Sequence, residues 1–226
     1  MDFSLSLGLS AAALFLYNLI ALLLRRASGL TLMLRSGSAW AAKHVAGRSA
    51  PDVTLAIQTL RNTVLVATFI GTLSFTVASA TLAALPGAPD GPARVRGLLQ
   101  AGLLTGAFLN FALVIRCAAH AGYAIGSATG AEAGISGSSG GGGATAPALL
   151  LPPPVPAELD SLVHMQAVHF SLGFRCMYCA IPFSFAVAGP EALVVVTSFV
   201  ICFLFYIDHA IWIWGGGGCG RPPRAH

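Results

Sequence analysis

The residues best suited to chemistry are two opposite charges, Arg175 and Asp208, inside long apolar stretches of the sequence. A charge at membrane depth is costly, so it is normally paired or faces a wet cavity. If the two stretches form a hairpin at Gly189 and Pro190, these side chains differ in depth by about 6 Å, which an arginine can bridge. The pair then either locks the hairpin or snorkels to the interface. The alternative is an ion or proton pathway, in which Asp208 and His209 exchange protons and Arg175 tunes them.

Other polar residues are expected at the ends of apolar stretches or within them. Arg61 and Asn62 precede one stretch, Arg116 and His120 end the next, and with His209 they form a candidate vestibule. Interfacial anchoring of the two arginines, or a hydrogen bond from Asn62 to a neighbouring helix, explains these residues equally well. Two more amides within stretches are expected to bond across helices, namely Asn18 and Asn110.

Catalytic and metal chemistry have little support. Cys176 and Cys179 have CxxC spacing, but they lie inside an apolar stretch and not at the helix N-terminus of a βαβ unit. His164 and His169 precede them, and five-residue spacing puts the two imidazoles on different helix faces. The sequence contains no HExxH, GxSxG, Walker or dinucleotide-binding motif. Only eight residues are acidic, and four of them, Asp2, Asp90, Glu132 and Glu191, lie outside spans or at their ends and form no obvious pair. We therefore expect no enzyme activity, no cofactor and no bound metal.

Five apolar stretches must position these residues. Hydrophobic residues make up 56% of the 226-residue chain and charged residues only 9%, whereas soluble domains average about 25% charged. Each stretch approaches the ~20 residues that a helix needs to cross a bilayer, and none alternates like a barrel strand. The sequence predicts an all-α integral membrane protein, a bundle of about five transmembrane helices, at approximately 3–24, 63–85, 98–116, 168–188 and 192–214.

The distribution of basic residues predicts the topology. Six of the twelve basic residues lie between the first two spans, so the positive-inside rule makes 25–61 a cytoplasmic loop. The N-terminus is then outside, and the C-terminus is cytoplasmic. Part of this loop is either a helix on the membrane surface or a loop with an accidental apolar side. The net charge of +4 is explained by topology, so we expect no nucleic-acid partner.

Two segments have the composition of disordered chain. Gly, Ser and Pro dominate 126–157, which is expected to be a disordered linker, and 215–226 is expected to be a flexible tail. Small residues also recur at four-residue spacing in the first three spans, which suits close packing within the bundle or a homodimer.

Several motifs resemble a family of multi-span membrane proteins. The first is the A-x-Q-T-L-R-N stretch from Ala56 to Asn62, at the start of a span. Others are Leu109 to Phe111 with Ile115, Arg116, His120 and Ala121; Leu172 to Arg175 with Tyr178, Pro182 and the Gly189-Pro190 turn; and Phe203 to Asp208. In this order they resemble domain of unknown function 599, known in plants and bacteria. The resemblance implies a multi-span protein of unknown activity, although the Gly/Pro linker departs from the family's more compact loop.

Two classes of function remain open. The sequence favours a structural, scaffold or adaptor component of a membrane, with the lipid bilayer as its surroundings. A homo-oligomer and a cytoplasmic protein partner both stay open. The alternative is a small transporter or channel subunit that uses Arg175, Asp208 and His209. The sequence does not distinguish the plasma membrane from an endomembrane.

Overall fold

The protein is a bundle of long helices. The computed structural model describes residues 2–23, 50–88, 91–135 and 157–215, and these contain five α-helices and two short 3-10 turns. The α-helices are α1 (Phe3–Leu23), α3 (Ala50–Ala84), α4 (Gly91–Ile135), α5 (Ala157–Phe185) and α6 (Pro190–Gly215); the turns are η2 (Leu85–Gly87) and η3 (Ala186–Ala188). All five α-helices contain a stretch long and apolar enough to cross a membrane. The prediction of an all-helical protein with five candidate spans is confirmed.

Three helices are longer than the spans predicted from hydropathy. α3 begins at Ala50 and α5 at Ala157, with acidic residues in the first turn of each, where they favour the positive end of the helix dipole. α4 continues to Ile135, so the first ten residues of the expected linker, 126–135, are helical. This stretch contains three alanines, the strongest helix formers, and three glycines. The rest of that linker, most of the basic loop and nearly all of the tail lie outside the described residues.

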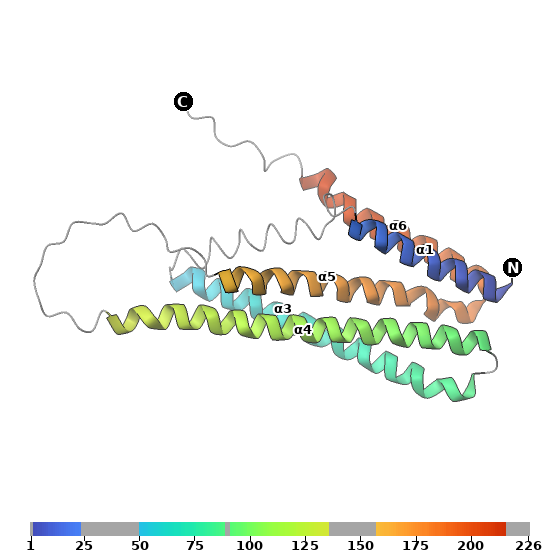
Figure 1. The fold of residues 1–226 in the computed structure, drawn as a ribbon, viewed down its shortest axis with the longest axis horizontal. Helices are drawn as coiled ribbons and strands as arrows, with labels where there is room; N and C mark the ends of the chain where they lie inside the picture. The colour runs from blue at the N-terminus through green and yellow to red at the C-terminus, as the bar shows by residue number, and fades with distance from the viewer. Residues whose placement is uncertain (1, 24–49, 89–90, 136–156, 216–226) are drawn as a thin grey trace, which may run out of the picture.

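The helices alternate in direction. Figure 1 shows one end of the bundle where α1, α4 and α6 begin and where α3 and α5 end; we call it the common end. The turn from α5 to α6 lies there, and Gly189 has a positive φ of 121° that residues with a side chain rarely adopt. Pro190 then begins α6, a position where its missing N–H costs no helical hydrogen bond.

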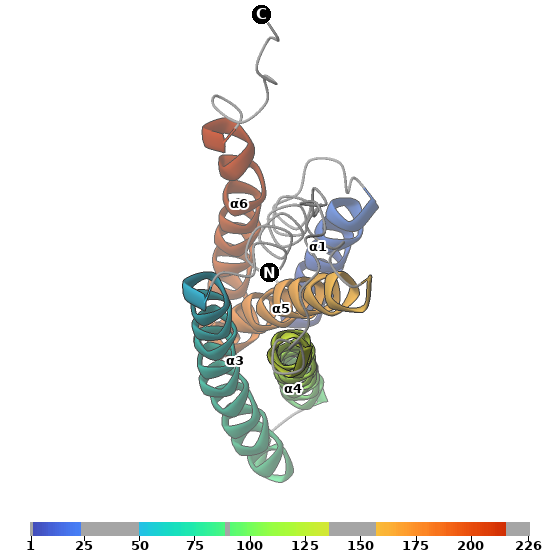
Figure 2. The ribbon, with the colours of Figure 1, turned by 90° about the vertical axis from the view of Figure 1, so that its left-hand side faces the viewer.

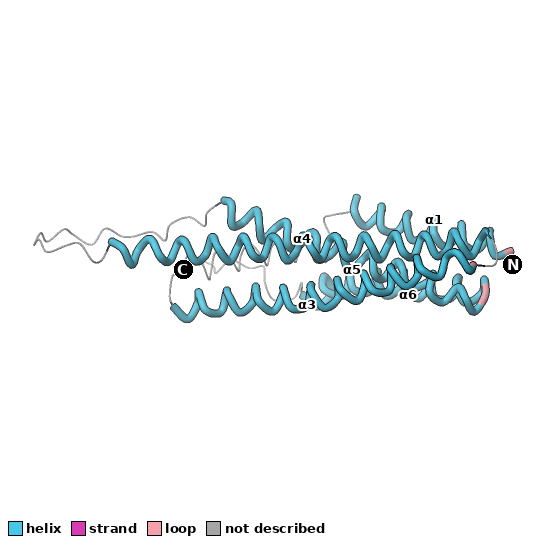
Figure 3. The backbone as a smooth tube through the Cα atoms, turned by 90° about the horizontal axis from the view of Figure 1, so that it is seen from below, coloured by secondary structure: helices cyan, strands magenta, loops and turns pink. Residues whose placement is uncertain are grey.

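The bundle has two parts along its length. α1 and α6 lie beside the part of α5 near the common end, whereas α3, α4 and α5 continue beyond them (Figures 1 and 3). We call this continuation, residues 50–60, 117–135 and 157–165, the three-helix arm. Figure 2 shows α5 between α4 on one side and α1 and α6 on the other. The arm has its own apolar core, made of Ala56, Leu60, Ala118, Ala121, Ile125, Leu159 and Val163.

The centre of the bundle is organised around Phe111 on α4. Its side chain is fully buried, and its ring meets those of Phe170 and Phe174 edge-on, at centroid distances of 6.0 and 5.3 Å. Glycines allow α3 and α5 to approach it: a Cβ at Gly71 would lie 3.2 Å from the Phe111 Cβ, and one at Gly173 would lie 3.0 Å from the ring. Three helices therefore meet at one aromatic side chain.

Polar side chains also join α4 to α5. Asn110 lies 3.0 Å from the ring nitrogen Nδ1 of His169, and Gln100 donates a hydrogen bond of 2.8 Å to Ser184. The prediction that Asn110 bonds across helices is confirmed. Such bonds fix the register of two apolar helices, which packing alone would specify less sharply.

Candidate functional site

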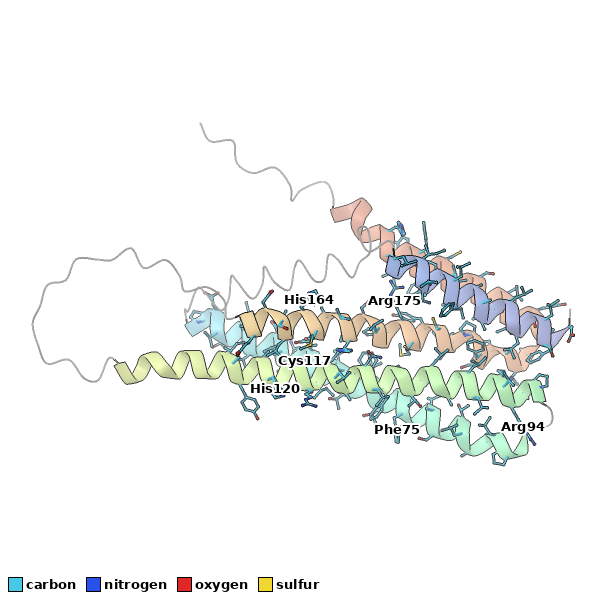
Figure 4. All side chains as sticks on the ribbon, viewed as in Figure 1. Phe75, Arg94, Cys117, His120, His164 and Arg175 are labelled. Carbon is cyan, nitrogen blue, oxygen red and sulfur yellow. The ribbon has the colours of Figure 1, made fainter. Side chains whose placement is uncertain are left out.

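Arg175 and Asp208 form an ion pair between α5 and α6. The Nη2 of Arg175 donates to both carboxylate oxygens of Asp208, at 2.6 and 2.7 Å. The two side chains are 17% and 8% exposed, so the pair is largely shielded from its surroundings. Figure 4 shows Arg175 on the side of α5 that faces α1. The hairpin at Gly189 and Pro190 brings the two charges together, as its geometry predicted.

α1 completes this site with two neighbouring residues. The hydroxyl of Tyr17 donates a 2.8 Å hydrogen bond to Asp208, and Asn18 accepts one of 3.1 Å from Nη1 of Arg175. The amide nitrogen of Asn18 also donates to the Leu14 carbonyl at 2.8 Å and to the Cys179 sulfur at 3.3 Å. We call Tyr17, Asn18, Arg175, Cys179 and Asp208 the polar cluster. It joins three helices, and the prediction that Asn18 bonds across helices is confirmed.

The polar cluster compensates its own charges. One guanidinium faces one carboxylate, so the cluster has no net charge, and the two carboxylate oxygens accept three hydrogen bonds. Charge-assisted hydrogen bonds of this length are the strong ones, particularly where little water competes. This arrangement can hold helices together. An ion-exchange site would instead need a carboxylate oxygen that is accessible from a water-filled path.

His209 takes no part in the polar cluster. Its ring stacks on Phe205 at a centroid distance of 4.1 Å, and its Nδ1 lies 3.0 Å from the Phe205 carbonyl oxygen. Consecutive residues on a helix point about 100° apart, so Asp208 and His209 point to different sides of α6. The structure does not bring the two proposed proton-exchange groups together.

The other vestibule residues lie on the surface, two on each of two helices. Arg61 and Asn62 are exposed on α3, and Arg116 and His120 are exposed on α4. Figure 4 shows His120 on the side of α4 that faces away from α5. Within the described part of the chain, none of these four makes a hydrogen bond or ion pair with another.

A cavity of about 560 Å³ lies between α1, α4 and α5, beside the polar cluster. It exists because α1 packs closely along α6 but touches α4 and α5 only sparsely. Its walls are almost entirely apolar, and its lining residues include Asn18 and Arg175. No group of three His, Cys, Asp or Glu that could hold a metal occurs among the residues described.

Sequence reasoning missed Tyr17. Its phenol lies within a long apolar helix, where a buried Tyr usually finds a polar partner, and it directly precedes Asn18. Two adjacent polar residues in a span were the available signal. Their partners could not be named, because Tyr17 and Asp208 are 191 residues apart in the sequence.

A family profile described as "Protein of unknown function, DUF599" matches residues 5–211. The chain belongs to this family. The match spans nearly all of the five α-helices and every residue of the polar cluster, and it confirms the resemblance seen in the motifs. No curated protein and no solved structure matches this DUF599 chain. The family description states no activity.

Proposed function

We propose that this DUF599 protein is a non-catalytic structural or scaffold component of a membrane. The observation that carries the proposal is the closed polar cluster. Its charged groups are satisfied by one another and tie α1, α5 and α6 together. A buried charge serves transport when it faces a wet path, but here Asp208 is 8% exposed and surrounded by donors from two helices.

The placement of charges along α4 suggests how the bundle sits in a bilayer. Arg96 lies near the common end and Arg116 lies 20 residues further along the same helix, about 30 Å away. This is close to the ~30 Å thickness of the hydrocarbon core. Arg61 lies 23 residues before the end of α3, about 34 Å from the common end, so it reaches the same level as Arg116. We infer that these arginines mark the two interfaces.

The three-helix arm then projects beyond the bilayer. α4 continues for 19 residues after Arg116, a length of about 28 Å. The positive-inside rule puts the arm in the cytoplasm and the N-terminus on the opposite side. The arm carries exposed His120, Tyr123, Glu158 and Asp160, whereas Arg61 and Arg116 lie at its base. A rigid arm with exposed carboxylates suits docking of a cytoplasmic protein with a basic face.

Ion-flux measurements in liposomes test the choice between scaffold and transporter. The purified protein and its Asp208→Asn variant are reconstituted at matched incorporation, and proton and monovalent-cation flux is measured against protein-free liposomes. We expect no flux above the protein-free level. Flux through the wild type that Asp208→Asn abolishes, while circular dichroism shows the helices intact, would refute the scaffold proposal and favour a transporter.

Site-specific photo-cross-linking in cells tests the arm as a docking platform. A photoreactive amino acid at Tyr123, which is 77% exposed on the arm, should give a discrete adduct with a soluble protein. The same group at Phe69, 71% exposed on α3 within the proposed bilayer region, is the matched control and should label lipid. If position 123 labels only lipid or nothing, the arm is not a docking platform.

A further inference from the structure

One face of α6 points away from the rest of the bundle. The residues that α6 buries against α1 and α5 include Leu193, Val200 and Leu204. The opposite face carries five residues at alternating spacings of four and three, namely Val195, Phe199, Cys202, Tyr206 and His209. The first four are exposed and the last is partly exposed; we call these five residues the α6 seam. A repeat of 3.5 residues is the spacing with which two helices pack along each other.

Tyr206 places a phenol at a depth where lipid offers it no partner. Arg96 and Arg116, which we infer to mark the two interfaces, lie about 8 and 38 Å from the start of α4. Tyr206 lies about 24 Å from the start of α6 at the same common end, close to midway between the interfaces. Its side chain is 64% exposed, and its hydroxyl has no hydrogen-bond partner among the residues that the structure describes. A lipid-facing tyrosine normally lies at an interface, because an unpaired hydroxyl is costly in hydrocarbon.

His209, three residues further along the α6 seam, supplies an unused acceptor. Its Nδ1 lies 3.0 Å from the carbonyl oxygen of Phe205. A carbonyl oxygen only accepts, so we assign the hydrogen to Nδ1, and the neutral ring then has its acceptor lone pair on Nε2. The ring stacks on Phe205, one turn nearer the common end, so it does not extend toward the interface that Arg116 marks. In the described part of the chain, Nε2 has no partner.

We propose that the α6 seam packs against the same seam of a second copy of this protein, and that the Tyr206 hydroxyl of each copy donates to Nε2 of His209 in the other. Both copies cross the bilayer in the same orientation, so a two-fold axis along the bilayer normal places equivalent residues at equal depth. Tyr206 and His209 differ in depth by three residues, about 4.5 Å, which is the step between adjacent layers of the seam. One symmetric contact therefore pairs two donors with two acceptors.

A second copy fits this face because the donor and the acceptor lie on the same surface, which makes that surface complementary to itself. The dimer depends on the bilayer depth inferred from the arginines, but it does not depend on docking of a cytoplasmic protein. It leaves the polar cluster inside each copy unchanged, since Asp208 is buried on another side of α6.

Oxidative cross-linking through Cys202 tests the position of the α6 seam. Cys202 is exposed near the middle of the seam, so a two-fold contact brings its thiol close to the same thiol of the second copy. The full-length protein with Cys219→Ser, which removes the last cysteine of the sequence, is reconstituted in phosphatidylcholine vesicles and oxidised with copper phenanthroline. We expect a disulfide-linked dimer that disappears when Cys202→Ser is added.

A second exposed position provides the matched control. Phe69→Cys in the Cys202→Ser, Cys219→Ser background places a thiol on the exposed face of α3 and should cross-link several-fold less. Equal cross-linking through the two positions would show random collisions in the bilayer and would overturn the proposal. Protein that stays monomeric at every protein-to-lipid ratio would also overturn it, because the α6 seam then has no second copy as its partner.

Two substitutions that keep an aromatic ring test the hydrogen bonds. Association is measured by Förster resonance energy transfer between copies labelled at the C-terminus, over a range of protein-to-lipid ratios. Tyr206→Phe removes only the hydroxyl, and the loss of two bonds between membrane helices should raise the dissociation constant roughly tenfold. Tyr123→Phe, on the three-helix arm, is the matched control and should leave the dissociation constant unchanged.

His209→Phe keeps a ring that can stack on Phe205 and removes the Nε2 acceptor. It should weaken association as much as Tyr206→Phe, and the double variant should be no weaker than either single variant, because each change breaks the same bonds. Effects that multiply in the double variant would show that the two residues do not pair and would overturn the proposal. An unchanged dissociation constant in Tyr206→Phe would overturn it as well.

Discussion

Removing one partner of the Arg175–Asp208 pair should destabilise the protein more than removing both. Asp208→Asn leaves Arg175 without its counter-charge, and Arg175→Gln leaves the Asp208 carboxylate with Tyr17 as its remaining donor. Breaking a buried ion pair in this way costs roughly 3–5 kcal/mol. We take about 3 kcal/mol for each variant, because the Arg175 side chain is 17% exposed and partly hydrated.

The double variant contains no charge at this site. The Asn and Gln amides can still bond to one another and to Tyr17 and Asn18, so the loss should be about 2 kcal/mol, from weakened hydrogen bonds. Additive losses would total about 6 kcal/mol, so the coupling energy should be about 4 kcal/mol. Coupling energies between close charge pairs are roughly 1.5–7 kcal/mol, and the expected value falls within this range.

Reversible unfolding in mixed micelles measures these losses. The fraction of sodium dodecyl sulfate is raised, and helix content is followed by circular dichroism for the wild type, both single variants and the double variant. Glu191→Gln is the matched control, since it removes a carboxylate from the exposed start of α6 and should lose no more than about 1 kcal/mol. A double variant that loses as much as the two single variants together would refute the coupling that we derive from the geometry.

Four further substitutions, one of them a control, probe the bundle with the same unfolding assay. Gly173→Ala places a Cβ 3.0 Å from the Phe111 ring and should cost about 1–3 kcal/mol, whereas Gly102→Ala, with nothing within 4 Å, should cost nothing or stabilise slightly. Tyr17→Phe removes one hydrogen bond to a carboxylate and should cost about 1–2 kcal/mol; no loss would mean that this bond does not form. Leu159→Ala removes a fully buried side chain of the arm and should cost about 2–5 kcal/mol. Hydrogen exchange should then accelerate in the arm but not in α6, and equal acceleration in both would show that the arm is not a separate unit.

Continuous apolar runs made the five spans predictable, because only helices satisfy the backbone over such lengths in lipid. The same runs concealed how the helices pack. A helix that is apolar on every face has no single apolar stripe, so its sequence does not show which side packs against a neighbouring helix. The pairing of Arg175 with Asp208 could be predicted because one tight turn joins their helices, and depth follows from counting residues. Tyr17 could not be assigned to this pair, because nothing local specifies that α1 packs along α6.

The ends of the helices were the least predictable feature of the chain. Hydropathy detects the part of a helix that lies in lipid, and it loses the signal where the helix continues into water. α4 passes Arg116 without a proline or a helix-ending glycine turn, and its continuation packs small side chains such as Ala118 and Ala121 against the other two helices of the arm. Burial in the arm therefore accounts for the continuation of α4 beyond Arg116 as far as Ile125.

One side chain joins three helices at the interior of the bundle. Arg175 holds α6 through Asp208 and α1 through Asn18. Apolar side chains of α1 also pack in one cluster with those of α5 and α6, among them Leu14 and Phe183. The position of α1 therefore depends on both the polar cluster and this apolar packing. Loss of Arg175 should weaken the attachment of α1 to both neighbours, whereas the apolar packing remains.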